Sequence, residues 1–346
     1  MKEKPHWFRW ILLTVGGVLL IVKMTHPLVP SPSWGQPTMG TLCHITLSSS
    51  LPDSVLKALR REIDAELQQV NQRMSTWQSD TEISQFNKFQ SLDPFPVSPE
   101  FAGVVRHALE ISAETDGAFD PTVKPLVDHW GFGPEADTGL LAEIMKTVGW
   151  EKVVLAGNSL SKKEENLQLD LSAIAKGYGV DAVADVIRSF DLKNFLVEIG
   201  GEIVASGLNP DQKPWRVGVE SPQVSAAYSS GIFRTLELLD EAMATSGDYR
   251  NFRTREDGTR FSHIIDPRTG QPSETDIASV SVLAGSCMEA DAAATALFVM
   301  GSKKGMEWLL ARRELDGENR SELEAFFILH TTNQTFTTRA TSGFPE

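Results

Sequence analysis

The chain has 346 residues, of which 41% are hydrophobic and 23% charged, a composition typical of a soluble globular protein with a full core. Its formal net charge of −14 at pH 7 argues against a nucleic-acid-binding protein, which needs a basic face for phosphate contacts. A nucleotide substrate stays compatible with this charge, because a bound cation can offset it locally. The two cysteines, Cys43 and Cys287, are too few for a disulfide framework and lack metal-ligand spacing, so we expect buried free thiols.

The N-terminus predicts a membrane anchor. Lys2 and Lys4 precede an apolar run, and Arg9 lies near its start. The run ends at Lys23, and no small-residue cleavage site follows it. The run is about 16 residues long, short for a full membrane span and long for the core of a signal peptide. We interpret residues 1–24 as an uncleaved signal anchor with its basic end in the cytoplasm, and a cleaved signal peptide is the alternative.

Both interpretations export the rest of the chain to the periplasm, and the anchor would hold it at the inner membrane. Residues 25–37 contain four prolines and are predicted to be a linker. Residues 38–346 are predicted to form a single domain.

The domain begins with clear patterns of strand and helix. Residues 42–47 alternate as in a strand, and apolar residues recur at helical spacing over residues 55–74. Ser98 followed by Pro99 predicts another helix start, whereas residues 117–134 are rich in glycine, proline and aromatic residues without periodicity, which is typical of a binding loop. The remaining predicted elements are a helix at 140–148, a hairpin within 153–171, strands at 195–199, 203–206, 215–220, 234–239 and 279–284, and a hairpin at 325–338.

The stretch from Asp170 to Tyr178 is the first candidate for chemistry. A strand-like segment ends at Leu171, and Ser172 is a favoured N-cap for the helix that follows. The start of a helix offers backbone N–H groups and a positive dipole end to a phosphate. Asp170 and Lys176 flank this position and indicate nucleotide chemistry. Most such turns carry no ligand, however, so a plain structural turn is the alternative.

A second candidate follows the strand at 279–284. Ser286 and Glu289 fit a capping box, so we expect a helix that runs from there to Gly301. Asp291 and Thr295 are four residues apart and share one face of this helix, which could hold an oxygen-coordinated cation such as Mg²⁺. Spacing alone favours the alternative, a small-residue helix packed closely on the sheet with Asp291 serving the helix dipole.

Two further features allow both a structural and a functional interpretation. Gly200 and Gly201 lie between two predicted strands and permit a bulge or a close backbone approach to a ligand. His263 lies on a strand that runs into a turn, and a lone histidine there is more often structural than catalytic.

Taken together, a set of short motifs covering residues 38–339 resembles the ApbE family of flavin transferases, the FAD:protein FMN transferases. Each motif is weak alone, but their order and spacing are highly specific. The motifs are Met39-Gly40-Thr41, Met74-Ser75-Thr76-Trp77, Gly117-Ala118-Phe119-Asp120, Asp170 to Tyr178, Glu198-Ile199-Gly200-Gly201, Thr245 to Arg250, Ser262 to Gly270, and Glu289-Ala290-Asp291 with Thr295.

The resemblance implies an α+β fold with a T-fold-like core, mostly antiparallel sheet flanked by helices, after the N-terminal membrane anchor. It implies FAD as donor, Mg²⁺ as cofactor, and transfer of FMN through its phosphate to a Thr or Ser hydroxyl of another protein, with release of AMP. The acceptor would be a periplasm-facing subunit of a membrane redox complex, such as an NADH:quinone reductase-type or other electron-transport complex.

The same resemblance assigns site residues. The backbone carbonyl of Ala173, with Asp291 and Thr295, would hold the metal. The residues that would contact FAD are Met39, Trp77, Ala118, Phe119, Asp120, Asp170, Lys176, His263, Ile264 and Ile265. Two departures are visible: Trp77 stands where we would expect Tyr, and Ala294 stands where some members have an acid.

The chemistry of the residues agrees with this assignment. Lys176 can neutralise charge that grows during phosphoryl transfer, and the acceptor hydroxyl needs a base. His263 is the best candidate base by residue type, and Asp266 is the second. A hydrolase that splits FAD into FMN and AMP would use the same residues, and a non-catalytic flavin-binding protein would keep only the ring contacts. Retention of both Asp291 and Thr295 favours catalysis.

Overall fold

A computed structural model describes residues 28–135, 138–222, 231–249, 252–254, 260–316, 323–332 and 335–345. The predicted signal anchor at residues 1–24 lies outside these ranges. Within them, no helix combines the length and the apolar character that a membrane span requires.

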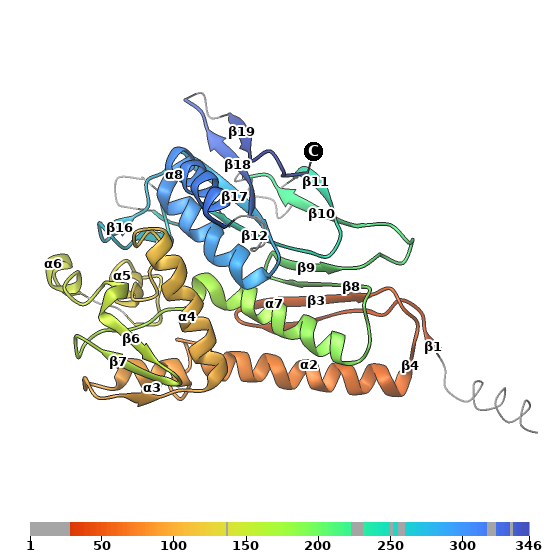
Figure 1. The fold of residues 1–346 in the computed structure, drawn as a ribbon, viewed down its shortest axis with the longest axis horizontal. Coiled ribbons are helices and arrows are strands. Elements are labelled where there is room, and N and C mark those ends of the chain that lie inside the picture. The colour runs from red at the N-terminus through yellow and green to blue at the C-terminus, as the bar shows by residue number, and fades with distance from the viewer. Residues whose placement is uncertain are drawn as a thin grey trace, which may run out of the picture.

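The centre of the fold is an eight-stranded sheet with the strand order β19-β18-β17-β12-β9-β8-β3-β2 (Figure 1). All of its neighbouring strands pair antiparallel, which confirms the predicted α+β class with a mainly antiparallel sheet. The strands are β2 (Ser33–Thr38), β3 (Thr41–Leu47), β8 (Phe195–Ile199), β9 (Glu202–Ser206), β12 (Glu241–Gly247), β17 (Ile277–Ala284), β18 (Glu324–His330) and β19 (Phe336–Ala340).

The linker predicted for residues 25–37 is wrong for its second half, because residues 33–37 belong to strand β2. Trp34 of this strand packs against the apolar core, and the guanidinium of Arg60 lies 4.8 Å from the centre of its ring. Pro37 is compatible with the strand because β2 is an edge strand, where a missing N–H group breaks no ladder hydrogen bond.

Three helices cover one face of the sheet: α2 (Asp53–Met74), α7 (Ser172–Ser189) and α8 (Cys287–Asp316), with α7 in contact with both α2 and α8 (Figure 1). Helix α8 is interrupted at Gly301, whose φ of 79° is not helical. This agrees with the helix end that the sequence predicts at this residue. The segment after Gly301 folds back on the first, since Arg312 pairs with Glu289 at 2.6 Å.

The opposite face of the sheet is covered by the ribbon of β10 (Trp215–Glu220) and β11 (Ile232–Leu238). Inward-pointing residues of this ribbon, such as Trp215 and Leu238, pack on Met243 and Phe326 of the sheet. Burial on both faces explains why every residue of β17 is buried.

Residues 74–171 form a smaller unit beside the helices (Figure 1). Helix α3 follows the Met74-Ser75-Thr76-Trp77 motif, and Thr81 caps it by accepting a hydrogen bond from the Ser84 amide at 3.3 Å. The unit's elements are α3 (Glu82–Lys88), α4 (Pro99–Glu114), α5 (Lys124–His129), α6 (Leu141–Ile144), a 3₁₀ turn (Trp150–Lys152), β5 (Phe95–Pro96), β6 (Val153–Ala156) and β7 (Ser159–Lys162).

The apolar core of this unit continues onto the first turns of α7 and α8 through Ile174, Ala292 and Ala296. The two helix starts are therefore shared by both parts of the fold. Short strands complete the chain: β1 (Leu28–Val29), β4 (Leu51–Pro52), β13 (Phe252–Thr254), β14 (Arg260–Ser262), β15 (Ile265–Asp266) and β16 (Gln271–Pro272).

Helices α7 and α8 touch at Gly177. A Cβ atom at this position would clash with the backbone carbonyl of Cys287 and would lie 2.8 Å from the Cβ of Asp291. Only glycine allows this approach, since real Cβ atoms keep larger distances.

We expect Gly177→Ala to destabilise the protein by about 1–3 kcal/mol, the usual cost of overpacking, despite the better helix propensity of alanine. Urea unfolding would measure the loss. Gly103→Ala in α4 is the matched control, because nothing lies within 4 Å of its Cβ position, and it should be neutral or stabilising. Equal effects of the two changes would contradict the close-contact explanation.

Candidate functional site

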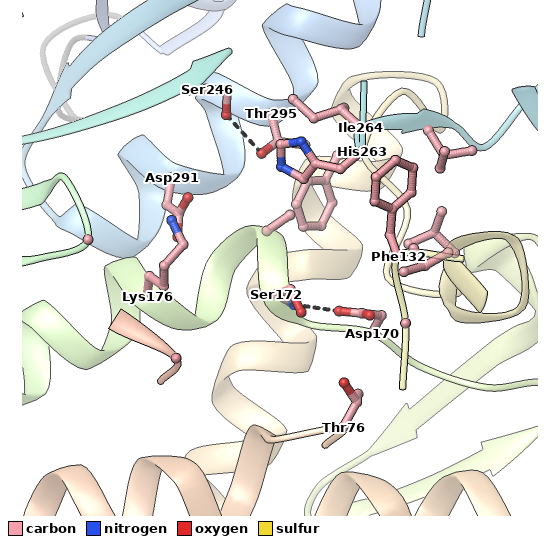
Figure 2. Close-up of a pocket in the computed structure, with 18 of the residues that line it drawn as sticks. Thr76, Phe132, Asp170, Ser172, Lys176, Ser246, His263, Ile264, Asp291 and Thr295 are labelled. Atoms are coloured by element: carbon pink, nitrogen blue, oxygen red, sulfur yellow. Dashed lines mark hydrogen bonds between the residues drawn. The ribbon is translucent and has the colours of Figure 1, made fainter. Parts of the chain in front are cut away.

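A cavity of about 510 Å³ lies where the starts of α7 and α8 meet the smaller unit and the end of the sheet (Figure 2). All the site residues predicted from the sequence line it except Asp266. The structure thus brings together Met39, Trp77, Ala118, Phe119, Asp120, Asp170, Ala173, Lys176, His263, Ile264, Ile265, Asp291 and Thr295.

Asp266 is not among the lining residues and is engaged elsewhere. Its carboxylate accepts two hydrogen bonds from the Arg268 guanidinium, one to each oxygen and both at 2.9 Å. It also accepts the Arg268 backbone N–H at 3.0 Å, so it braces the turn after β15. The structure does not support its prediction as a second candidate base.

The start of α7 differs from the prediction in its cap. Ser172 is the first helical residue, and Oδ1 of Asp170 accepts its backbone N–H at 2.7 Å. Asp170 is itself held in place, because its amide donates to the Pro121 carbonyl at 2.8 Å. A carboxylate at a helix start is favourable for the dipole. A phosphate at this end of the cavity would therefore meet a negative charge and would need a cation to bridge the two.

Asp291 projects from the first turns of α8 into the cavity (Figure 2) and is only 3% exposed. Its Oδ2 accepts the Gly177 backbone N–H at 2.9 Å. Burial raises the pKa of Asp291, while the charge of Lys176 and the Gly177 hydrogen bond act in the opposite direction. One turn further along, Thr295 Oγ1 lies 3.2 Å from Ser246 Oγ of β12.

The donors at this position fit a hard divalent cation. Asp291 offers a carboxylate, Thr295 a hydroxyl, and Ala173 of α7 lines the same cavity. No cluster of three or more His, Cys, Asp or Glu side chains suited to a metal occurs in the described ranges.

Asp181 of α7 is a supporting residue that the sequence did not reveal. Its two carboxylate oxygens accept the backbone N–H groups of Cys287 at 2.9 Å and Met288 at 2.8 Å, which caps α8 from the neighbouring helix. Burial raises its pKa to about 6. Of the predicted capping box, the Ser286 half is present, with Oγ accepting the Glu289 amide at 3.2 Å, whereas the Glu289 side chain pairs with Arg312.

The other half of the cavity is apolar and aromatic. The ring of Phe132 lies against His263 with ring centres 6.2 Å apart, and both residues line the cavity. In Figure 2, Phe132 lies across the cavity from Asp291 and Lys176, and His263 lies between them. Trp77 is 68% exposed, so its indole can stack on a planar ligand at the rim.

Asp120 lines the cavity and also has a structural role. It accepts the amides of Thr122 at 2.8 Å and Trp150 at 2.9 Å, which fixes the loop before α5, and burial raises its pKa to about 6.

Phe132 and two polar lining residues, Glu202 and Ser246, received no role from the sequence. Glu202, the first residue of β9, forms a salt bridge with Lys176, and Ser246 meets Thr295. Both belong to, or directly follow, short motifs noted above, but no local pattern shows which side chains will meet across the sheet.

The cavity therefore has a charged half that offers oxygen donors and an aromatic half. A histidine lies between the two halves. Residues 39–317 match the family model of the ApbE family. The chain belongs to this family.

Its similarity to other ApbE proteins extends over most of the chain. It is 47% identical to a FAD:protein FMN transferase of Vibrio cholerae over 277 residues, which are 78% of this chain and 81% of the relative. It is 38% identical to a FAD:protein FMN transferase of Haemophilus influenzae, covering 89% of this chain and 88% of the relative.

Solved structures give the same result. The flavin transferase ApbE from Vibrio cholerae matches with a TM-score of 0.80 and 41% identity, covering 92% of this chain and 99% of that one. The apo form of Pseudomonas stutzeri flavinyl transferase ApbE matches with a TM-score of 0.78 and 33% identity, covering 93% and 98%.

Proposed function

We propose that this ApbE-family chain transfers FMN from FAD to a Thr or Ser hydroxyl of another protein and releases AMP in a Mg²⁺-dependent reaction. The observation that carries the proposal is that one cavity holds Lys176, Asp291 and Thr295 together with His263 and Phe132. The curated relatives named FAD:protein FMN transferase support the same activity.

The division of the cavity suits the two ends of the reaction. The rings Trp77 and Phe132 can take a planar ring system of FAD, and the pyrophosphate then falls near Lys176 and the two helix starts. We assign Mg²⁺ to Asp291, Thr295 and the Ala173 carbonyl. When bound there, the ion supplies charge stabilisation to the phosphoryl oxygens and the leaving group.

The residues of the chain have distinct tasks in the transfer. The acceptor hydroxyl oxygen forms a bond to the FMN-side phosphorus, and the bond from this phosphorus to the bridging oxygen breaks, so that AMP leaves with the electron pair. The hydroxyl proton passes to His263, whose residue type titrates near neutral pH. Lys176 balances the negative charge that develops on the phosphates.

The direct test uses the purified protein, FAD, Mg²⁺ and an acceptor domain with an accessible Thr. Covalently flavinylated acceptor and one AMP per flavin, detected by mass spectrometry, would support transfer. Free FMN and AMP with unlabelled acceptor, over several acceptors, would assign the site to a hydrolase instead.

Asp291→Asn tests the metal assignment. The amide keeps the size and can still accept the Gly177 N–H, so the fold should persist, while Mg²⁺-dependent turnover should be abolished. If Asp291 only served the helix dipole, the change would cost on the order of 1 kcal/mol of stability and turnover would remain. Full activity of the variant at saturating Mg²⁺ would contradict the assignment.

His263→Ala tests the base. Loss of a general base lowers a rate by roughly 10²–10⁴-fold, and FAD binding should weaken much less because the rest of the cavity is unchanged. Rapid-quench measurement of transfer and fluorescence titration of FAD would separate the two effects. Parallel losses of binding and rate would indicate that His263 is a binding residue.

We also propose that residues 1–24 anchor the chain in the inner membrane with the domain in the periplasm, where it would meet subunits of membrane redox complexes. The basic residues before the apolar run motivate this orientation. N-terminal sequencing of the native protein should find the original N-terminus in the membrane fraction. A mature N-terminus beyond residue 25 would remove the anchor but not the export.

A further inference from the structure

Glu202 is the least exposed of the ionisable residues that line the cavity, at 1%. It follows the tight Gly200–Gly201 turn and pairs with Ile199 across β8 and β9. The turn is fixed on both sides, because Gly201 donates its N–H to Glu198 Oε1 at 2.5 Å and Gly200 packs against Thr41. These contacts hold the backbone where β9 begins, so Glu202 starts the strand at the lining of the cavity.

Lys176 lies between two buried carboxylates. Its ammonium group forms a salt bridge with Glu202, and its charge also acts on Asp291, where it opposes the rise in pKa that burial causes. Figure 2 shows the Lys176 side chain reaching from α7 towards Asp291. The next residue, Gly177, holds Asp291 through its backbone N–H. Lys176 and Asp291 are therefore close enough for the ammonium charge to act on the carboxylate.

An ammonium group and a divalent cation compete for one carboxylate, since each neutralises the same charge. We propose that Glu202 is a positioning residue that holds the Lys176 ammonium away from Asp291 and so keeps this carboxylate available to the cation. The inference rests on the proposed function, in which Asp291 is a metal ligand. Glu202 itself is not a ligand in this scheme and acts through the lysine.

The arrangement has a second effect on the substrate side. A lysine held by a buried carboxylate keeps its position, so it remains in the part of the cavity where the pyrophosphate would lie. Glu202 thus keeps the two cations at separate positions: the metal ion acts at Asp291, and the Lys176 ammonium acts beside it.

The experiment measures binding of Mn²⁺, a spectroscopic substitute for Mg²⁺, to the full-length protein in detergent by electron paramagnetic resonance. Glu202→Gln removes the charge at nearly constant size, and we expect the Kd for Mn²⁺ to rise about 10–100-fold, the range for residues that support metal ligands. The double variant Lys176→Met/Glu202→Gln removes the competing ammonium as well, and its Kd should return to within a few-fold of the wild-type value.

Glu241→Gln is the matched control. Glu241 begins the adjacent strand β12 opposite Ala205 and does not line the cavity, so its charge loss should leave Mn²⁺ binding unchanged. Lys176→Met alone should bind Mn²⁺ at least as tightly as the wild type. This variant tests the proposal even if Glu202→Gln fails to fold. A tenfold weaker affinity of Lys176→Met, or a double variant as weak as Glu202→Gln, would overturn the proposal.

Asp291→Asn distinguishes this failure from failure of the metal assignment. If Asp291→Asn abolishes Mn²⁺ binding but Glu202→Gln binds as the wild type does, only the positioning role is wrong. If Asp291→Asn binds Mn²⁺ normally, the metal site itself is wrong.

Discussion

The hydrogen bond from the Gly177 backbone to Asp291 is the interaction on which the site depends. It requires α7 and α8 to approach so closely that only glycine fits between them. Asp181 strengthens the same contact from α7 by capping α8. Two helices from distant parts of the sequence are thereby fixed in one register, and Lys176 and Asp291 are neighbours for that reason.

The cavity also depends on two apolar cores. The first turns of α7 and α8 pack into the core of the smaller unit, while their later turns pack on the sheet. The charged half of the cavity is built from the helices and the sheet, and Phe132 and Trp77 come from the smaller unit. A ligand that spans both halves would contact both parts of the fold at once.

Periodicity and motif order predicted much of this from the sequence. The helical pattern of α2, the end of the first α8 segment at Gly301 and the alternating strands β8 and β10 depend on local residue order, and the structure has them. The motifs predicted a set of residues that the fold does bring into one cavity. The linker prediction was wrong where distant contacts decide, because β2 forms with Trp34 packed on the core. The partners of Asp181 and Glu202 likewise lie on other elements, whereas Asp266 is engaged by the side chain of Arg268, two residues further along.

The strand order leaves β2 and β19 at the two edges of the large sheet in the part of the chain that the structure describes. An open edge offers unpaired backbone groups to a strand of a second molecule, which is a common start of aggregation. Pro37 interrupts the donors along β2, and the exposed Arg339 places a charge on β19. Both edges thus carry the features with which natural sheets resist growing from one copy into the next, and the sheet ends at eight strands.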